Sequence, residues 1–438
     1  MRFLYSWLIR CAVPLALAAI LWRGVHDRQH WRGLAQRLGF GAALPAPSIW
    51  LHAVSLGEMS AAAPLLRALR LRFPEIPLVV TTATPAGRAR AAALIEGSAD
   101  IRYLPYDTPG SVRRFLERIR PRAAIIMETE LWPNLLRECE RDGVPVLLAS
   151  ARLSAKSVTQ YRRFGSLFAG VFGKNLLVAA QSAEDAERFR SIGAAADRTV
   201  VVGNVKFDVG VDAGITQAGN ALRVAYAGTR PVWIAGSTHA GEEEQLLDAH
   251  ALLLASIPNA VLLLVPRHKD RFAGVAELLA RRGVKFARRS RMASGAEERL
   301  PSDAPVLLVD TVGELATLYA SADVAFVGGS LVPTGGHNLL EPAALGLPVL
   351  TGPSYFNGKE IAHLLLARGA ALEVKNAADL AAVLQRLLAE PATCKQIGSI
   401  GKEIIAANRG SVAKLLALIE PWLPGAELQT AEAGRAYR

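Results

Sequence analysis

The chain has 438 residues, of which 51% are hydrophobic and 20% charged, and its formal net charge is +11. This composition excludes a disordered or low-complexity protein, and the length allows two or three domains of about 150 residues each. The three cysteines, Cys11, Cys139 and Cys394, form no CxxC pair. Their odd number and wide spacing argue against a disulfide framework and favour a reducing compartment.

The first apolar segment runs from Phe3 to Trp22 and is about long enough to cross a bilayer as a helix. It lies in a basic region, because residues 1–40 contain six arginines and one acid, Asp27. One of these, Arg10, would cost roughly 2.5–3.5 kcal/mol at the centre of a spanning helix, although nearer an end its side chain can reach the interface. We therefore expect residues 1–24 to be an uncleaved membrane anchor whose basic flank stays in the cytoplasm.

Two other interpretations of this segment stay open. Ala16-Leu17-Ala18 has the pattern of a signal-peptide cleavage site, although the basic stretch that follows would oppose export. The segment could also be a buried helix of a soluble domain. The sequence does not decide whether an anchor here spans the bilayer or lies in its interface.

Beyond residue 45, short runs rich in Val, Ile and Leu alternate with helical patterns. This alternation predicts parallel sheets that are covered by helices on both faces. The expected strands form two series, 49–54, 78–82, 101–104, 123–129, 145–149, 176–180 and 199–202, then 232–236, 260–265, 284–287, 306–309, 324–328 and 348–351. We interpret 208–230 as a loop between two similar α/β domains. The predicted division is 25–215, 216–424 and a flexible tail, 425–438.

We expect no metal site and no nucleic-acid partner. The eight histidines form no ligand cluster, and His26 and His30 are more simply a solvated pair than a zinc site. The chain contains no Asp-x-Asp, a common way to hold a divalent ion against a nucleotide diphosphate. The positive charge is densest beside the most apolar end, which favours anionic lipid as its partner.

Two strand ends in the first series carry acids. Ser55-Leu56-Gly57-Glu58 follows the strand 49–54 and has the pattern of a capping box, so Glu58 is either a helix cap or a catalytic group. Glu128 and Glu130 lie at the end of the candidate strand 123–129, just before Leu131-Trp132. They are either a solvated strand end or partly buried acids whose pKa is raised toward a catalytic value.

Three strand ends in the second series suit an anionic ligand. Gly236-Ser237-Thr238-His239 precedes an acid-rich helix start, whose acids we interpret as partners of the helix dipole. Arg267 and His268 follow another strand, where a guanidinium can grip a phosphate, although a surface salt bridge is the alternative. The stretch 326–353 contains two glycine pairs, a polar tip and an acid, so its backbone can approach a ligand closely.

Seven segments, read together, resemble the 3-deoxy-D-manno-octulosonic acid (Kdo) transferase family. They occur in the family's order as HAVSLGE, ETELWPN, ARLS, GNVKFD, GSTHAGEEE, VPRHKDR and FVGGSLVPTGGHNLLEPAALGLPV. The resemblance extends from the N-terminal segment to about Arg409. One departure is Gly358, where the family pattern has a second aromatic residue.

The resemblance implies an α/β protein of the GT-B class, with two Rossmann-like domains after an N-terminal membrane-anchor helix. It implies an inverting, metal-independent transfer of Kdo from CMP-Kdo to a lipid A precursor (lipid IVA), in lipopolysaccharide synthesis, at the cytoplasmic side of the inner membrane and without a cofactor. By motif position, Glu58 matches the general base and Glu130 an essential acid near the acceptor. Together with the strand-end positions, the motifs predict donor contacts from Ser237, Arg267, His268, Gly328, Gly329, Ser330, Gly336, His337, Asn338 and Glu341, with Lys206 as an additional site residue.

Two alternatives stay open at this point. One is another GT-B enzyme, either a UDP-sugar transferase or a nucleotide-sugar epimerase, although an epimerase would need no membrane anchor. The other is a basic, membrane-bound binding protein without catalysis. Such a protein would bind lipid or nucleic acid with a steep dependence on salt and would not depend on Glu58.

Overall fold

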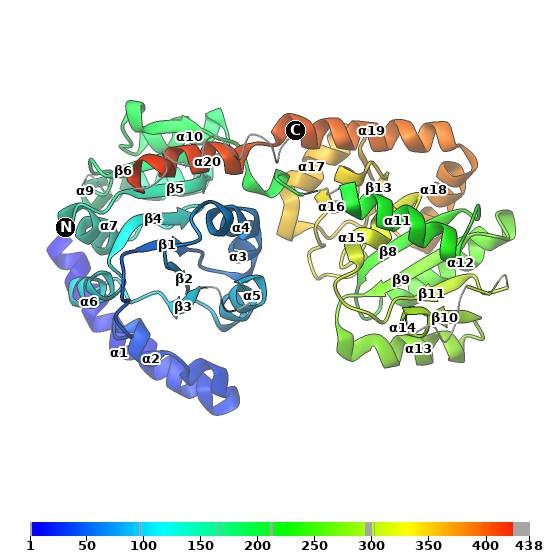
Figure 1. Ribbon diagram of the computed structural model, residues 1–438, viewed down its shortest axis with the longest axis horizontal. Helices are drawn as coiled ribbons and strands as arrows, with labels where there is room; N and C mark the ends of the chain where they lie inside the picture. Colours follow the sequence, from blue (N-terminus) through cyan, green and yellow to red (C-terminus); the bar gives the residue numbers. More distant parts are fainter. Residues whose placement is uncertain are drawn as a thin grey trace. The chain divides into compact units, whose positions relative to one another are not determined.

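The computed structural model describes residues 2–95, 97, 99–163, 165–168, 170–210, 213–293, 300–301 and 303–423. The chain forms two compact units (Figure 1). Of the described residues, unit 1 contains those up to 208 together with 408–423, and unit 2 contains those between 209 and 407. The predicted flexible tail, 425–438, lies outside the described residues.

Unit 1 is built on a seven-stranded sheet in the order β3-β2-β1-β4-β5-β6-β7. Every pair of neighbouring strands is parallel. The strands are β1 (Ser48–His52), β2 (Leu78–Thr82), β3 (Asp100–Tyr103), β4 (Pro121–Met127), β5 (Val146–Ala151), β6 (Leu176–Ala180) and β7 (Thr199–Val201). The central strands are buried along their whole length, as continuous apolar runs in a parallel sheet require.

Helices cover both faces of this sheet. The helices of unit 1 are α1 (Arg2–His26), η1 (Arg28–Trp31), α2 (Leu34–Arg37), α3 (Leu56–Ala61), α4 (Ala63–Arg72), α5 (Pro85–Ile95), α6 (Pro109–Ile119), α7 (Pro133–Arg141), α8 (Ala155–Arg163), α9 (Gly165–Phe168), α10 (Ala183–Ser191), η2 (Ala196–Arg198), η3 (Val205–Phe207), α20 (Ser411–Ile419) and η6 (Glu420–Trp422). One apolar cluster joins the sheet to α3, α4, α5 and α20, and a second joins its other face to α6, α7, α8 and α10.

Unit 2 repeats this architecture with a second parallel sheet, in the order β10-β11-β9-β8-β12-β13-β14. Its strands are β8 (Val232–Thr238), β9 (Val261–Pro266), β10 (Phe286–Arg288), β11 (Val306–Leu308), β12 (Val324–Val327), β13 (Val349–Thr351) and β14 (Ala371–Glu373). Its helices are α11 (Ala213–Tyr226), α12 (Glu243–Ser256), η4 (Lys269–Arg271), α13 (Phe272–Arg281), α14 (Arg289–Ala293), α15 (Leu315–Ala320), α16 (Leu340–Leu345), η5 (Phe356–Gly358), α17 (Lys359–Ala367), α18 (Ala377–Ala389) and α19 (Pro391–Asn408). Two apolar clusters again lie on opposite faces.

The interpretation of 208–230 as a loop was wrong, because the structure has α11 there. Its glycines suggested a loop, but Gly219 serves helix packing. A Cβ at this position would lie 2.5 Å from the Cβ of Ala320 on α15, so the glycine allows the two helices to approach closely. The predicted domain boundary at 215/216 therefore falls inside a helix, and the two units divide at 208/209. The short edge strand β14 was also missed.

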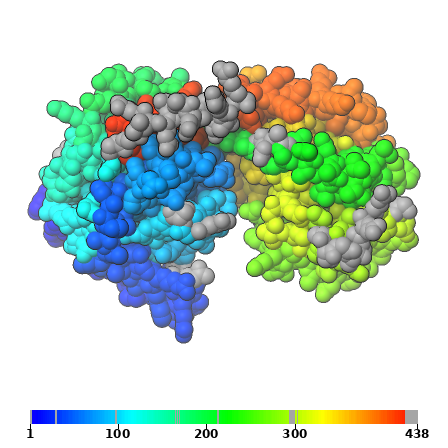
Figure 2. All heavy atoms as spheres, in the orientation of Figure 1, coloured from blue at the N-terminus to red at the C-terminus, as the bar shows by residue number. Residues whose placement is uncertain are grey.

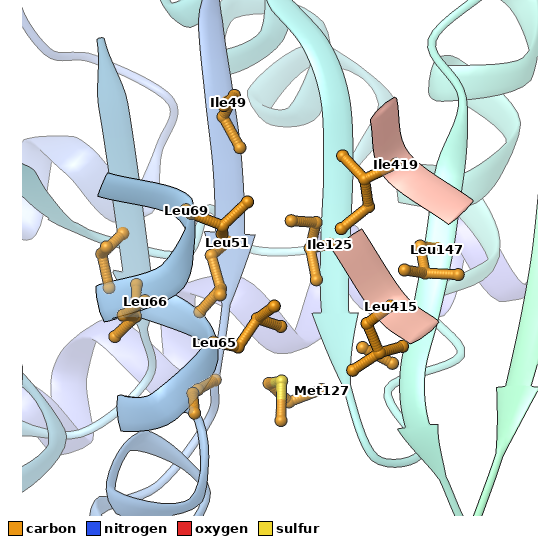
Figure 3. Packing of buried hydrophobic residues seen from close by; sticks show 14 of the residues in the cluster. Ile49, Leu51, Leu65, Leu66, Leu69, Ile125, Met127, Leu147, Leu415 and Ile419 are labelled. Atoms are coloured by element: carbon orange, nitrogen blue, oxygen red, sulfur yellow. The ribbon is translucent and has the colours of Figure 1, made fainter. Parts of the chain in front are cut away.

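The predicted end of the second domain at residue 424 differs from the structure as well, because α20 belongs to unit 1. Its residues Leu415 and Ile419 are fully buried in the cluster that contains Ile125 of β4 and Leu147 of β5 (Figure 3). Asp208 is the last residue of unit 1 before the chain enters unit 2. Its carboxylate accepts hydrogen bonds from the amides of Gly410 at 2.6 Å and Val412. The last helix therefore completes the core of the first domain.

We predict that Leu415→Ala destabilises unit 1 by about 2–5 kcal/mol, because it removes a buried side chain and leaves a cavity. Hydrogen exchange followed by mass spectrometry checks this. Amides of β4 and β5 should exchange faster, while those of β8 and β9 in unit 2 should not change.

Lys414→Ala, at the neighbouring exposed position, is the matched control and should leave all four strands protected. If Leu415→Ala accelerated exchange in unit 2 instead of unit 1, the assignment of α20 to unit 1 would be wrong.

Candidate active site

The carboxyl ends of the unit 1 strands lie at one edge of the sheet, and Glu58 lies at the helix start that follows β1. The Ser55 side chain accepts a hydrogen bond from the Glu58 amide at 3.3 Å, which is the predicted N-cap. The Glu58 carboxylate accepts a hydrogen bond from the Val54 amide at 2.8 Å through Oε2. Its Oε1 has no hydrogen-bond partner in the described part of the chain. One oxygen therefore helps to cap the helix, and the other is free to accept a proton.

The environment of Glu58 raises its pKa to about 7. Burial is the largest cause, because it disfavours the charged carboxylate. The Val54 amide and the charge of Lys206 lower the pKa, whereas the charges of Glu128 and Glu130 raise it further. A carboxyl group with a pKa near neutrality is suited to act as a general base at physiological pH.

Glu128 follows β4 directly and has a backbone φ of 55°, in the left-handed region that non-glycine residues seldom adopt. Strain of this kind persists where the surrounding structure imposes it, and it is common at functional sites. The carboxylate lies 3.7 Å from the ammonium of Lys206 and 3.8 Å from the guanidinium of Arg152. Sequence reasoning noted this acid but gave it no separate role, and its position immediately after the strand was the available signal.

Glu130 accepts a hydrogen bond from the indole N–H of Trp132 at 2.7 Å. Burial raises the pKa of Glu130, the Trp132 bond lowers it, and the charge of Glu128 raises it. The prediction of a partly buried acid next to this apolar pair is thus confirmed, while its part in catalysis stays a prediction.

Lys206 lies in η3, just after β7, in the GNVKFD segment. The side chain of Asn204 caps this turn by accepting the Lys206 amide at 3.0 Å. Asn204 is held by Gln181, which in turn donates to the carbonyl of Ser150, another non-glycine residue with a positive φ. The structure therefore brings Glu58, Glu128, Glu130 and Lys206 together from three separate strand ends.

In unit 2, the corner after β8 and the corner after β12 are in direct contact. Ser237 is buried and has a φ of 61°. A Cβ at Gly328 would lie 2.5 Å from the carbonyl oxygen of Ser237, so only glycine fits there. The backbones of the two predicted donor motifs, one at Ser237 and one at Gly328, are therefore in contact.

Glu242 organises this contact and was missed as a site residue, because its place at a helix start suggested only a dipole partner. It is fully buried, and its carboxylate accepts the amides of Gly329, Ser330 and Leu331 at 2.7–3.0 Å and the amide of His239 at 3.2 Å. These amides are therefore not available to a ligand. The Ser330 hydroxyl is also buried, and it donates to the carbonyl of Val327.

The side chains of Arg267 and of three histidines also lie at this edge. His239 Nε2 lies 2.7 Å from His337 Nε2 with the rings stacked, and His268 packs edge-on against His239. Burial lowers the pKa of His337 to about 4, with further contributions from the charges of Arg267, His239 and His268. Arg267 is exposed and makes no ion pair with any residue that the structure describes.

The second glycine pair lies in the polar loop beside the cluster of Arg267 and the three histidines. Gly335 and Gly336 both have a positive φ, and the Gly336 amide donates to the carbonyl of Gly329. Asn338 is exposed, and its amide side chain donates to Glu341 at 3.1 Å. A Cβ at Gly358 would meet no atom within 4 Å, so the missing aromatic residue leaves open space.

Among the described residues, no group of three or more His, Cys, Asp and Glu side chains could hold a metal ion. Within the described ranges, one helix, Phe3–His26, is long and apolar enough to cross a membrane by length and composition, with a mean hydropathy of 1.8. The chemistry available is therefore a base at the edge of one sheet and an arginine-histidine cluster, which suits an anion, at the edge of the other.

Two Rossmann-like units with these sites define a glycosyltransferase of the GT-B class. A family model described as 3-deoxy-D-manno-octulosonic-acid transferase (kdotransferase) matches residues 32–209, and one described as glycosyl transferases group 1 matches residues 244–404. A solved UDP-N-acetylglucosamine 2-epimerase structure from Listeria monocytogenes is similar over 88% of this chain and 98% of its own, with a TM-score of 0.51. At 14% identity, this last likeness shows the fold alone.

Two curated relatives cover almost the whole chain. The 3-deoxy-D-manno-octulosonic acid transferase of Haemophilus influenzae is 39% identical over 427 residues, covering 96% of this chain and 99% of the relative. The enzyme of the same name from Bordetella pertussis is 39% identical over 435 residues, with the same coverage. The chain belongs to the 3-deoxy-D-manno-octulosonic acid transferase family.

We predict that Glu58 titrates near pH 7 in the folded protein. Glu128→Gln should lower its pKa by removing a nearby negative charge, and Lys206→Met should raise it by removing a positive one. Carbon NMR of side-chain carboxyl groups, with Glu58→Gln used to assign the signal, measures both shifts. Glu75→Gln, at an exposed position, should leave the pKa unchanged, and equal shifts in all three variants would contradict the proposed coupling.

A second prediction concerns Glu242. Glu242→Gln replaces an acceptor oxygen by an amide donor that faces backbone N–H groups, so we expect a loss of about 1–3 kcal/mol in the free energy of unfolding. Guanidinium denaturation measures it. The control is Glu277→Gln, at an exposed position on α13, and a loss no greater than the control's would show that the buried carboxylate is not required.

Proposed function

We propose that the chain transfers Kdo from CMP-Kdo to a lipid A precursor, with inversion at the anomeric carbon and with Glu58 as the general base. The observation that carries this proposal is the partly buried Glu58 carboxylate, whose pKa is raised to about 7 and whose Oε1 is free. Membership of the Kdo transferase family supports the choice of sugar.

On the acceptor side, a sugar hydroxyl donates its proton to Glu58 as its oxygen attacks the anomeric carbon of Kdo. The bond between that carbon and the phosphate oxygen breaks, and CMP leaves with the electron pair. Glu128 and Lys206 act as positioning residues, because their charges shift the Glu58 pKa in opposite directions. Glu130, near the same group, is proposed to contact the acceptor.

On the donor side, leaving CMP gains negative charge on its phosphate. We propose that Arg267 and the one Nδ1–H left by the hydrogen-bonded pair of neutral histidines, His239 and His337, stabilise this charge, because a cation and preorganised N–H donors act most strongly where charge develops. His268 lies beside them, and Asn338 and Glu341 offer polar groups for the remaining donor hydroxyls. The loop from Gly328 to Ser330, with Ser237 and Gly336, contributes shape, because its amides are already bonded to Glu242 and to each other.

The proposed place of action is the cytoplasmic leaflet of the inner membrane. The apolar segment of α1, with arginines beside it, supports attraction to anionic lipid. An enzyme held there meets an acceptor that is itself a lipid.

The test is Kdo transfer by detergent-solubilised protein, with CMP-Kdo and tetraacylated lipid A precursor, in the presence of EDTA. Product mass counts the Kdo units added. Glu58→Gln should reduce kcat by about 10²–10⁴-fold, the usual contribution of a general base. In the wild type, the rate should fall as the pH drops below about 7, because protonated Glu58 cannot accept the proton.

Glu75→Gln is the matched control and should keep full activity. Arg267→Ala should lose activity with a raised KM for CMP-Kdo. Full activity of Glu58→Gln would move the role of base to Glu128 or Glu130, and no product from folded wild type would refute Kdo transfer.

A further inference from the structure

The first two turns of α1 are bonded to the carboxyl edge of the unit 1 sheet. The Tyr5 hydroxyl donates to Asp107 Oδ2 at 2.9 Å, and the Ser6 hydroxyl donates to the side-chain oxygen of Asn134 at 2.9 Å. Asp107 follows β3, and Asn134 begins α7 after β4. The amino end of α1 therefore lies at the same edge of the sheet as Glu58.

These contacts reach a buried part of the domain. Asp107 is buried, and its carboxylate also accepts the amides of Asn134 at 3.0 Å and Leu135 at 2.7 Å, so it caps α7. The Asn134 side chain donates to the Asp107 carbonyl at 2.6 Å. Tyr5 and Ser6 thus join a hydrogen-bond network that starts the helix beyond Glu130.

The other end of α1 leads through η1 and α2 back to the sheet of the same unit. The indole N–H of Trp31 donates to the Leu21 carbonyl at 3.0 Å, and Trp31 packs against Gly24. Arg37 then donates to the Ala83 carbonyl after β2 and stacks on Tyr103, with its carbon Cζ 4.1 Å from the ring centroid. The chain therefore returns to the carboxyl edge of the sheet directly after α1.

One face of α1 is partly covered, and the opposite face is not. The partly or fully covered positions are spaced three or four residues apart, at Tyr5, Ser6, Ile9, Val13, Ala16, Leu17, Ile20 and Gly24. The exposed large apolar side chains, which we call the α1 surface, are Phe3, Leu4, Trp7, Leu8, Leu15, Leu21, Trp22 and Val25. In Figure 2 the lower end of the dark blue N-terminal segment projects from unit 1. An apolar patch of this kind marks an interaction site.

A cavity of about 240 Å³ adjoins the α1 surface. Its lining includes Phe3 and Trp7 from α1 and two guanidinium groups, Arg10 of α1 and Arg137 of α7. Neither arginine makes an ion pair with a residue that the structure describes. Two unpaired arginines beside aromatic rings suit a phosphate attached to apolar chains, because guanidinium groups bind phosphate through paired hydrogen bonds.

We propose that α1 lies in the plane of an anionic lipid bilayer instead of crossing it, with a lipid headgroup phosphate between Arg10 and Arg137. A spanning α1 would carry Tyr5 and Ser6 to the far side of the membrane, whereas both are bonded to the folded domain. In the plane, the α1 surface enters the acyl region, and the arginines stay at the level of the headgroups. Arg10, unfavourable in a spanning helix, becomes a binding group.

This arrangement deepens the proposed function, on which it rests for the lipid nature of the acceptor. It places the carboxyl edge that carries Glu58 and Glu130 against the membrane surface.

The first test is a crosslink in native membranes. Ser6→Cys and Asn134→Cys are combined with Cys11→Ala and joined by oxidation or a short bis-maleimide, with linked peptides detected by mass spectrometry. We expect most chains to be linked. No linked peptide in folded protein, with the control pair Thr108→Cys and Ser111→Cys linked under the same conditions, would overturn the proposal.

The second test leaves the bonded residues Ser6 and Asn134 unchanged. A cysteine-bearing tag before Met1, in the Cys11→Ala protein, should react with an impermeant maleimide only after the inner membrane is opened, as a tag at the carboxyl terminus should. Reaction of the amino-terminal tag in intact spheroplasts would mean that α1 spans the membrane and would refute the proposal.

The third test addresses the phosphate site. Binding to vesicles of phosphatidylcholine with phosphatidylglycerol should weaken about fivefold in Arg10→Gln and in Arg137→Gln, since one basic residue near an anionic surface contributes about 1 kcal/mol. Arg386→Gln, at an exposed position on α18, is the control and should bind as wild type. Losses no larger than the control's would remove the phosphate site. None of the three tests depends on Kdo transfer, so a failed activity assay and a failed orientation are distinguishable.

Discussion

The burial of carboxylates at the carboxyl edge of a parallel sheet is the constraint on which both units depend. Taking a charged group out of water is unfavourable unless hydrogen bonds or opposite charges compensate. Both sheets are parallel, and parallel strands all end at one edge, so groups that follow different strands meet there. How each carboxylate is compensated decides what it can do.

Glu58 and Glu242 show the two outcomes. Glu242 is fully buried and receives four backbone amides, so it holds the loop after β12 against the corner after β8. Burial raises the pKa of Glu58 to about 7, because only one amide compensates its charge and two other acids lie near it, so Glu58 can exchange a proton. The same residue type, at the start of a helix after a strand, is a structural group in one unit and a candidate base in the other.

The carboxyl edge of unit 1 also receives the amino end of α1 through Asp107 and Asn134. Asp107 connects three functions of the fold, because it ends the loop after β3, caps α7 and accepts the hydroxyl of Tyr5. In the proposed mechanism and membrane orientation, this one edge of the sheet carries both the base and the helix that binds the membrane.

The sequence by itself determined the alternation of strands and helices. Strands 78–82 and 176–180 were predicted with their observed bounds, because a strand buried on both faces must be a continuous apolar run. The sequence also indicated which strand ends carry polar groups. It therefore identified Glu58, Glu130, Arg267 and Asn338 as candidate site residues. The motifs that resemble the Kdo transferase family are likewise short, local segments of the sequence.

Only the tertiary structure decided how these groups act. The local pattern Ser-x-x-Glu is the same whether Glu58 caps a helix or acts as a base. The pKa of Glu58 depends on its burial in the fold and on the charges of Glu128, Glu130 and Lys206, which come from distant strand ends. Glu242 looked like a dipole partner until the fold placed three amides of another loop beside it. α20 belongs to unit 1 because it contacts segments that lie hundreds of residues earlier in the chain. The amino end of α1 is bonded to a segment about a hundred residues later. No local sequence pattern encodes such contacts.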